Sequence, residues 1–114
     1  MNAVQRDVAT EGSVLDEMVR RIVERFSPQR IILFGSRARG KATADSDYDL
    51  LIIAPSSQER WRRAVPVYDA LMGLRIGKDI VWWTEDEIAE WRTVKNHFIS
   101  SAVREGVVLY EADA

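Results

Sequence analysis

The sequence predicts a single α/β domain in which a small mixed β-sheet is flanked by helices. Three observations support this fold class. The chain has 114 residues, a length that suits one compact domain. Four short runs of apolar, mostly branched residues alternate with segments whose apolar positions recur at helical spacing. Hydrophobic residues make up 46% and charged residues 30% of the chain, which is typical of a globular protein with one core.

The chain opens with a predicted helix and a predicted strand. Over residues 13–26 the apolar side chains recur every three or four positions, and Ser13 is suited to cap the first turn. Pro28 ends this helix because proline cannot continue the hydrogen-bond pattern. Residues 30–35 then have the continuous apolar character of a buried strand, and a short helical turn is expected over residues 36–40.

The middle of the chain predicts strand, helix and strand. Residues 48–54, YDLLIIA, read as the second strand after the turn-forming residues ADSD. Helical spacing of apolar residues continues from 57 to about 74, although Pro66 must bend or shorten that helix. Residues 77–84, GKDIVWWT, are the third strand.

The last third predicts one helical region and a final strand. Thr84 followed by Glu87 has the pattern of a capping box, which indicates a helical region from 85 to about 105. Gly106 ends this region, and residues 107–112 are the last short strand.

Charge and composition limit the expected partners and compartment. Sixteen basic and eighteen acidic residues give a net charge of -2, so we expect no membrane association and no direct nucleic-acid binding. The chain contains no cysteine, which excludes disulfides and thiolate metal sites. No apolar run approaches the roughly 20 residues of a membrane span, and we expect a cytoplasmic protein. Residues 1–12 are expected to form a flexible N-terminus, and 13–112 the domain.

Two aspartates stand at the start of the second predicted strand. Asp47 and Asp49 are two residues apart, and alternate side chains of a strand share one face, with Cα atoms about 6 to 7 Å apart. Unpaired carboxylates so placed repel each other, whereas Mg²⁺ favours oxygen ligands, usually one or two carboxylates plus substrate phosphates. Phosphoryl-type transfer often uses two cations and a third carboxylate. Asp79, which begins the apolar run DIVWW, is the best candidate for it.

The segment GSRARG has the residue types of a phosphate-binding turn. Gly35 lets a phosphate approach the backbone, the hydroxyl of Ser36 is a donor, and a helix N-terminus after them would favour an anion. Nearby positive charge comes from three side chains, Arg37, Arg39 and Lys41. Metal ligands and phosphate-binding groups are therefore expected side by side.

These motifs resemble those of a known superfamily. The GS pair, ten residues and then DYD match the G-S-x10-D-x-D signature of the polymerase-β-like nucleotidyltransferase superfamily, and KDIVW matches its later strand with the third aspartate. The resemblance covers residues 13–110. The chain also has the length of the minimal nucleotidyltransferases, or MNT proteins, which are commonly paired with HEPN-domain toxins. The resemblance implies the polymerase-β-like nucleotidyltransferase fold.

The resemblance also implies roles for the matched residues. Three would bind the triphosphate: Gly35, Ser36 and Arg39. Three would be catalytic and hold magnesium, with two ions expected: Asp47, Asp49 and Asp79. Asp79 would also accept the proton of the attacking hydroxyl. The implied reaction transfers a nucleoside monophosphate, AMP from ATP, and releases pyrophosphate. Family antitoxins transfer it to a tyrosine of the partner HEPN toxin.

Several of these residues also have simpler interpretations. The segment DSDYD is consistent with a solvated turn before a strand, and Asp79 alone with a surface carboxylate at a strand end. The three basic side chains of the turn are equally consistent with a solvated face. Most of the four tryptophans are expected in the core, with Trp82 and Trp83 on opposite sides of their strand. His97 is expected at the surface of a helix.

Three functions compete on this sequence. The first is a magnesium-dependent nucleotidyltransferase that acts as the antitoxin of a HEPN toxin. The second is a binding module that neutralises its partner by stoichiometric contact without catalysis. The third, transfer to a small molecule, ranks last because related antibiotic-modifying enzymes add a further domain for the acceptor. A template-directed polymerase is disfavoured because the chain has no basic groove.

Overall fold

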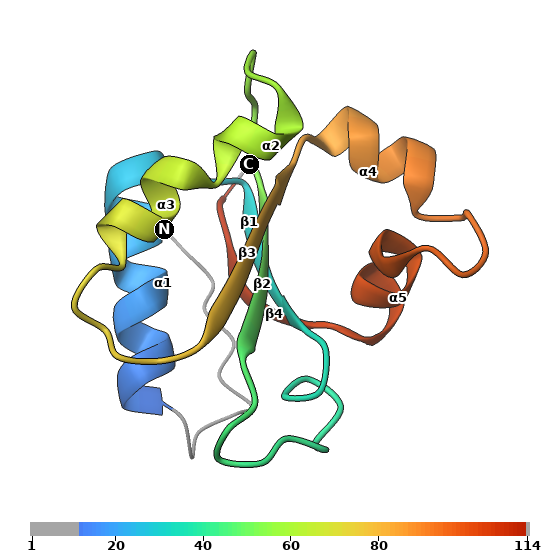
Figure 1. The fold of residues 1–114 in the computed structure, drawn as a ribbon. Coiled ribbons are helices and arrows are strands. Elements are labelled where there is room, and N and C mark those ends of the chain that lie inside the picture. The colour runs from blue at the N-terminus through green and yellow to red at the C-terminus, as the bar shows by residue number, and fades with distance from the viewer. Residues whose placement is uncertain (1–11, 114) are drawn as a thin grey trace.

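The computed structural model describes residues 12–113, which form a four-stranded sheet between two groups of helices (Figure 1). The strands are β1 (Arg30–Phe34), β2 (Tyr48–Ile53), β3 (Lys78–Trp83) and β4 (Val107–Glu111). Their order in the sheet is β3-β2-β1-β4. The β2–β3 pair is parallel, and β1 is antiparallel to both β2 and β4. The predicted α/β class with one mixed sheet is confirmed.

The helices cover both faces of the sheet. They are α1 (Gly12–Phe26), α2 (Arg60–Arg63), α3 (Val65–Ala70), α4 (Glu85–Trp91) and α5 (Phe98–Glu105). Figure 1 shows α1 and α3 on one side of the strands and α4 and α5 on the other. Along β2 the buried side chains alternate between the two layers: Leu50 and Ile52 pack in the α1 layer, and Leu51 and Ile53 in the α5 layer. The sheet is therefore buried on both faces, as its near-continuous apolar strands require.

Helix α1 fits the predicted helix over residues 13–26. Leu15, Met18 and Ile22 are fully buried against the sheet at helical spacing. The helix ends at Phe26, and Ser27 takes a left-handed conformation with φ 45° directly before Pro28. The capping role expected of Ser13 concerns a side chain outside the described part of the structure.

The prediction of one helix from 57 to about 74 is wrong in its extent. The structure forms two short helices, α2 and α3, and Pro66 lies in the first turn of α3, where its missing N–H costs nothing. Two large apolar side chains of this segment point outward: Trp61, one of the tryptophans expected mostly in the core, is 69% exposed, and Met72 is 73% exposed. Trp83 is buried, and the expected placement of Trp82 and Trp83 in opposite layers is confirmed.

The helical region predicted over residues 85–105 is likewise interrupted. The capping box of Thr84 and Glu87 is confirmed at the start of α4. The helix ends near Trp91, and the chain reaches α5 through a loop in which Asn96 has φ 65°. His97 is the N-cap of α5: its Nδ1 accepts the N–H of Ile99. The expectation of a surface histidine within a helix is therefore corrected.

The ring of His97 is packed rather than solvated. It lies 4.6 Å from the ring of Trp91 and 5.0 Å from that of Phe98, between centroids. These rings extend the buried layer around Trp83 and hold the start of α5 against the sheet. Among the described helices, none is long and apolar enough to cross a membrane.

Candidate active site

The candidate site lies at one end of the sheet, where the termini of three neighbouring strands come together. The chain leaves β1 at Phe34, and it enters β2 at Tyr48 and β3 at Lys78. Because β1 is antiparallel to β2 and β2 is parallel to β3, these three ends lie together, at the lower end of the sheet in Figure 1. Asp49 is the register partner of Phe34 on one side and of Asp79 on the other. The sheet itself thus brings the second and third predicted carboxylates to adjacent positions.

Both carboxylates occupy the face of the sheet that α5 covers. Asp49 lies two and four residues before Leu51 and Ile53 on β2, and Asp79 lies four residues before Trp83 on β3, so each shares the face of those side chains. Those three apolar residues belong to the α5 layer. Asp49 is half-buried and Asp79 is exposed. The pair therefore stands at the open margin of a packed layer, where a substrate can reach it.

Gly35 is fitted against Asp49. Its backbone has φ 77°, in the left-handed region that disfavours other residues. A side chain at this position would also collide with the carboxylate of Asp49. The sequence predicts that glycine at position 35 lets a phosphate come close to the backbone. The structure shows a second reason for glycine, because the Asp49 carboxylate lies against this residue.

A second glycine has the same relation to Asp47. A side chain at Gly77 would collide with the carboxylate oxygen of Asp47. Sequence reasoning did not select Gly77, although it directly precedes the strand that carries Asp79. The signal in the sequence is a glycine two residues before the acidic residue of an apolar strand. Each of the two neighbouring aspartates on the β2 side thus lies against a glycine from another loop.

The carboxylates interact unfavourably in the absence of a cation. Burial raises the pKa of Asp49 above its ordinary value, and the negative charges of Asp79 and Asp47 raise it further. Arg39 opposes this shift from the phosphate-binding side. The structure thus brings four predicted site residues within electrostatic range: three acids and one base.

The donor set fits a divalent cation shared with a substrate. In the part of the chain described here, no three His, Asp or Glu side chains converge as a ready-made metal site. Mg²⁺ does not require one, since it commonly takes one or two carboxylates and completes its shell with substrate phosphates and water. A cation beside Asp49 would also relieve the repulsion that raises its pKa.

The predicted phosphate-binding segment is a hydrogen-bonded turn. The carbonyl of Gly35 accepts the N–H groups of Ala38 and Arg39, and that of Ser36 accepts the N–H of Lys41. The expected short helical turn exists, but no helix follows it, so the helix N-terminus expected after Gly35 is absent. The turn is too short to build the dipole of a helix. An anion bound at this position would be held by side chains and backbone N–H groups and not by a helix dipole.

Two neighbouring arginines of this turn have different surroundings. Arg37 donates from Nε and Nη2 to the carbonyl of Ser46, and from Nη2 to that of Thr43, and its guanidinium lies 4.0 Å above the ring of Tyr48. It therefore ties the loop before Asp47 to the turn. Arg39 is exposed and acts on Asp49 through its charge. Of the two, Arg39 remains available to a ligand.

A family model decides the wider classification. The model of the nucleotidyltransferase domain matches residues 15–109, which is most of the chain. The chain belongs to the nucleotidyltransferase domain family. The enzyme class predicted from the GS and DYD motifs, nucleotidyltransferase, is confirmed at this level. The described strands that carry the candidate carboxylates all lie inside the matched region.

Similar proteins agree with this assignment. The chain is 44% identical over 51 residues to "Putative protein adenylyltransferase MJ1305" of Methanocaldococcus jannaschii; the match covers 43% of this chain and 35% of that protein. The matched part of this chain thus spans about a third of that relative's length.

Two solved structures show the fold. One is a "putative nucleotidyltransferase from Sulfolobus solfataricus", with a TM-score of 0.62, 22% identity, and coverage of 88% of this chain and 79% of that one. The other belongs to a toxin–antitoxin crystallised with AMP-PNP, with a TM-score of 0.58, 22% identity, and coverage of 86% and 73%. The nucleotidyltransferase fold predicted for this chain is confirmed.

Proposed function

We propose that this protein is a magnesium-dependent nucleotidyltransferase that transfers AMP from ATP to a tyrosine hydroxyl of a partner HEPN-type toxin and so acts as an antitoxin. The observation that carries the proposal is the juxtaposition of Asp49 and Asp79 on adjacent strands beside the turn that begins at Gly35. The name of the Methanocaldococcus relative supports adenylyl transfer to protein, and the toxin–antitoxin structure supports the kind of partner.

In the proposed reaction, one group of residues binds the triphosphate and another holds the metal ions. Gly35, Ser36 and Arg39 hold the triphosphate, with Arg39 supplying the charge that no helix provides here. Asp47 and Asp49 hold the magnesium ions, and Asp79 completes the site. When bound, the ions neutralise charge on the phosphates and lower the pKa of the acceptor hydroxyl.

The chemical step is an in-line displacement at the α-phosphorus. The acceptor oxygen forms a bond to the α-phosphorus while the bond to the bridging oxygen of pyrophosphate breaks. The acceptor proton passes to the carboxylate of Asp79, which is exposed at the free edge of the sheet, where a second protein can reach it. Pyrophosphate leaves as the second product.

The decisive experiment is the intact mass of the partner toxin after co-expression with this protein. We expect the toxin to gain the mass of one or more AMP units and to lose toxicity, and both effects to disappear with Asp49→Ala. An unmodified toxin bound in a stable complex with the wild-type protein would contradict the proposal.

Inhibition by contact alone is the second candidate function. It is favoured by the exposed apolar side chains near α2 and α3: Trp61, Val65 and Met72. If this function holds, the double variant Asp47→Ala/Asp49→Ala protects fully against the toxin, and Trp61→Ser/Met72→Ser does not. The opposite pattern excludes it.

A further inference from the structure

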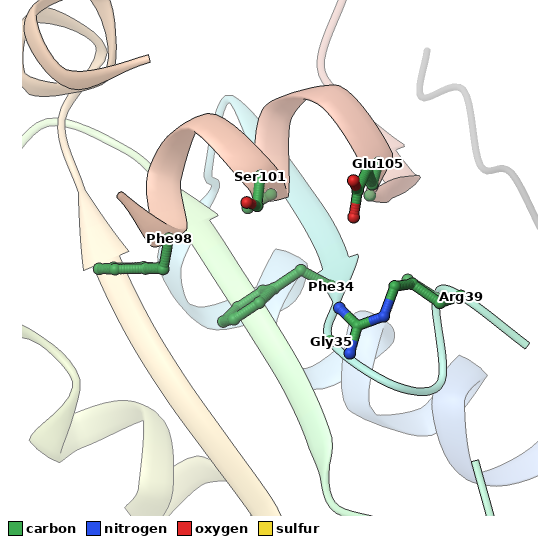
Figure 2. A pocket seen from close by; sticks show the side chains of 9 residues that line it. Phe34, Gly35, Arg39, Phe98, Ser101 and Glu105 are labelled. Atoms are coloured by element: carbon green, nitrogen blue, oxygen red, sulfur yellow. The ribbon is translucent and has the colours of Figure 1, made fainter. Parts of the chain in front are cut away.

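A cavity lies next to the phosphate-binding turn, and of the residues that line it only Gly35 and Arg39 have a role in the proposed reaction. It has a volume of about 310 Å³, at the lower end of the roughly 300–1,000 Å³ typical of small-molecule sites. One wall is the side of α5 that carries Phe98, Ser101 and Glu105. The other wall is the end of β1 and the following turn, with Phe34, Gly35, Ala38 and Arg39. Figure 2 shows side chains from both walls facing the same space.

The wall on α5 is a single helical face. Phe98, Ser101 and Glu105 are three and four residues apart, the spacing that places side chains one above another. At 1.5 Å per residue the face from Phe98 to Glu105 is about 10 Å long. The cavity is therefore elongated along the helix and has two distinct ends.

Polarity changes from one end of the cavity to the other. At one end stand Glu105, Arg39 and the backbone of Gly35. Ser101 follows in the middle. At the far end are the rings of Phe34 and Phe98, whose centroids lie 6.0 Å apart. Phe98 is 40% exposed, so ring surface is open to a ligand.

This order matches the order of groups in a nucleotide: phosphates, sugar, base. The phosphate end is fixed by the turn at Gly35, which also contacts the carboxylate of Asp49. A nucleoside extending from it along α5 would place its sugar hydroxyls near Ser101 and Glu105. Its base would lie against the two phenylalanine rings, since bases stack on aromatic side chains.

Glu105 has the chemistry to recognise a sugar. A carboxylate accepts hydrogen bonds and so pairs with the donors of a ribose. Its described ion pair, to Arg104 at 3.4 Å, is exposed and weak, so Glu105 can exchange it for a ligand. Arg39 stands across the same end of the cavity and offsets the repulsion between Glu105 and the phosphates.

We propose that this cavity is the nucleoside-binding pocket, in which Glu105 and Ser101 select ribose and Phe34 and Phe98 stack the base without reading its edge. The inference rests on the proposed function, because it requires the triphosphate at Gly35. Among the described residues that line the cavity, those at the ring end carry no hydrogen-bonding side chain, so selection there depends on stacking area. The pocket therefore discriminates strongly between sugars and weakly between purine bases.

The first test separates the pocket from the phosphate site. Binding of ATP and of inorganic tripolyphosphate, each with Mg²⁺, is measured by calorimetry for the wild type and for Ser101→Trp, which fills the middle of the cavity. We expect ATP affinity to fall at least roughly tenfold and tripolyphosphate affinity to stay within about twofold. The control is Ser57→Trp, the same change at an exposed position beyond the opposite end of β2. It should alter neither affinity.

The outcomes distinguish the two hypotheses. If Ser101→Trp binds ATP as tightly as the wild type does, the pocket assignment is wrong and the proposed function stands. If the wild type binds neither ATP nor tripolyphosphate, the proposed function fails, and the pocket assignment fails with it. Thermal unfolding of each variant checks that it folds.

The second test does not depend on filling the cavity. Wild-type protein should bind ATP at least roughly tenfold more tightly than 2′-deoxy-ATP, and ATP and GTP within about threefold of each other. Glu105→Gln should reduce the preference for ribose and leave the ratio of ATP to GTP unchanged. Equal affinity of the wild type for ATP and 2′-deoxy-ATP would overturn the assignment of Glu105.

Discussion

The two ends of the parallel strand pair β2–β3 each carry a partly buried acidic side chain, and the pKa values of the two are shifted in opposite directions. At the end where the strands begin, Asp49 faces Asp79 and Asp47, and its pKa is raised. At the end where they finish, Glu87 accepts hydrogen bonds from Arg63 at 2.6 Å, from Arg60 and from the N–H of Thr84, and its pKa is lowered to about 2. Both acids are partly buried, so the difference comes from their neighbours.

The comparison separates charge that stabilises the fold from charge that the proposed function assigns to ligand binding. Glu87 has donors within the protein and closes the start of α4 on the sheet. Asp49 has two carboxylates beside it and only the charge of Arg39 to offset them, and in the proposed function a bound cation supplies the missing positive charge. Groups held in such unfavourable surroundings are typical of functional sites. Four predictions test this distinction.

The largest effect is expected for Asp49→Asn. The amide keeps the shape of the side chain but removes the negative charge that we propose holds the metal, so AMP transfer to the partner should fall by at least roughly a hundredfold. Thermal stability without metal should rise, because the repulsion with Asp79 is gone. Transfer is measured by labelled ATP and stability by thermal unfolding. Asp69→Asn, an exposed acid on α3, serves as the control. A stable variant with full activity would contradict the site.

The next effect concerns the contact between Gly35 and Asp49. Gly35→Ala and Gly40→Ala both place alanine at a left-handed φ, 77° and 72° respectively, so each should lose about 1–2 kcal/mol of stability. Only Gly35→Ala also pushes against the Asp49 carboxylate, because nothing lies within 4 Å of a side chain at Gly40. We therefore expect a further loss of stability, and roughly tenfold lower transfer, for Gly35→Ala alone.

Equal effects of the two glycine variants on unfolding and on transfer would show that backbone strain alone matters. Urea unfolding and the labelled-ATP assay give the two readings. The comparison is internal, since both residues lie in the same turn.

The strands that carry this site are better predicted from the sequence than the helices around them. Strand positions follow from continuous branched runs, and Asp49 and Asp79 each lie near the start of such a run, so pairing of β2 with β3 places them side by side. The helices are less predictable because their ends depend on local breaks: Pro66 starts a new helix, and Asn96 with a positive φ separates α4 from α5. As a result Trp61 is exposed and His97 becomes a cap.

Contacts between segments that are far apart in the chain cannot be predicted from the hydrophobic pattern of the sequence. The fit of Gly77 to Asp47 and the cavity between α5 and the turn at Gly35 depend on how loops meet across strands. The two roles of Arg37 and Arg39 illustrate this. Both are arginines of one turn, and only the fold decides that Arg37 holds the loop at Ser46 and Arg39 faces the carboxylates.

The third variant tests the stabilising end. Glu87→Gln leaves the guanidinium of Arg63, whose side chain is only 8% exposed, without its anionic partner. We expect a loss of about 2 kcal/mol in the free energy of unfolding, measured with urea, and unchanged transfer activity. Glu24→Gln removes an exposed pair with Arg20 and should cost less than about 0.5 kcal/mol. A comparable loss in both variants would mean that Glu87 is no more important than a surface acid.

The smallest effect is the pH dependence that Glu87 contributes. Its pKa is about 2 in the folded protein and about 4.5 when unfolded, so between these values the unfolded chain binds more protons. Its contribution to stability is complete above about pH 4.5 and is lost as the pH falls towards 2. Glu17, whose pKa is also about 2, contributes in the same window. Because Glu17 is present in both proteins, it cancels in the difference between wild type and Glu87→Gln. That difference should shrink steadily from pH 5 to pH 2. A difference that stays constant over this range would show that Glu87 acts through packing and not through its charge.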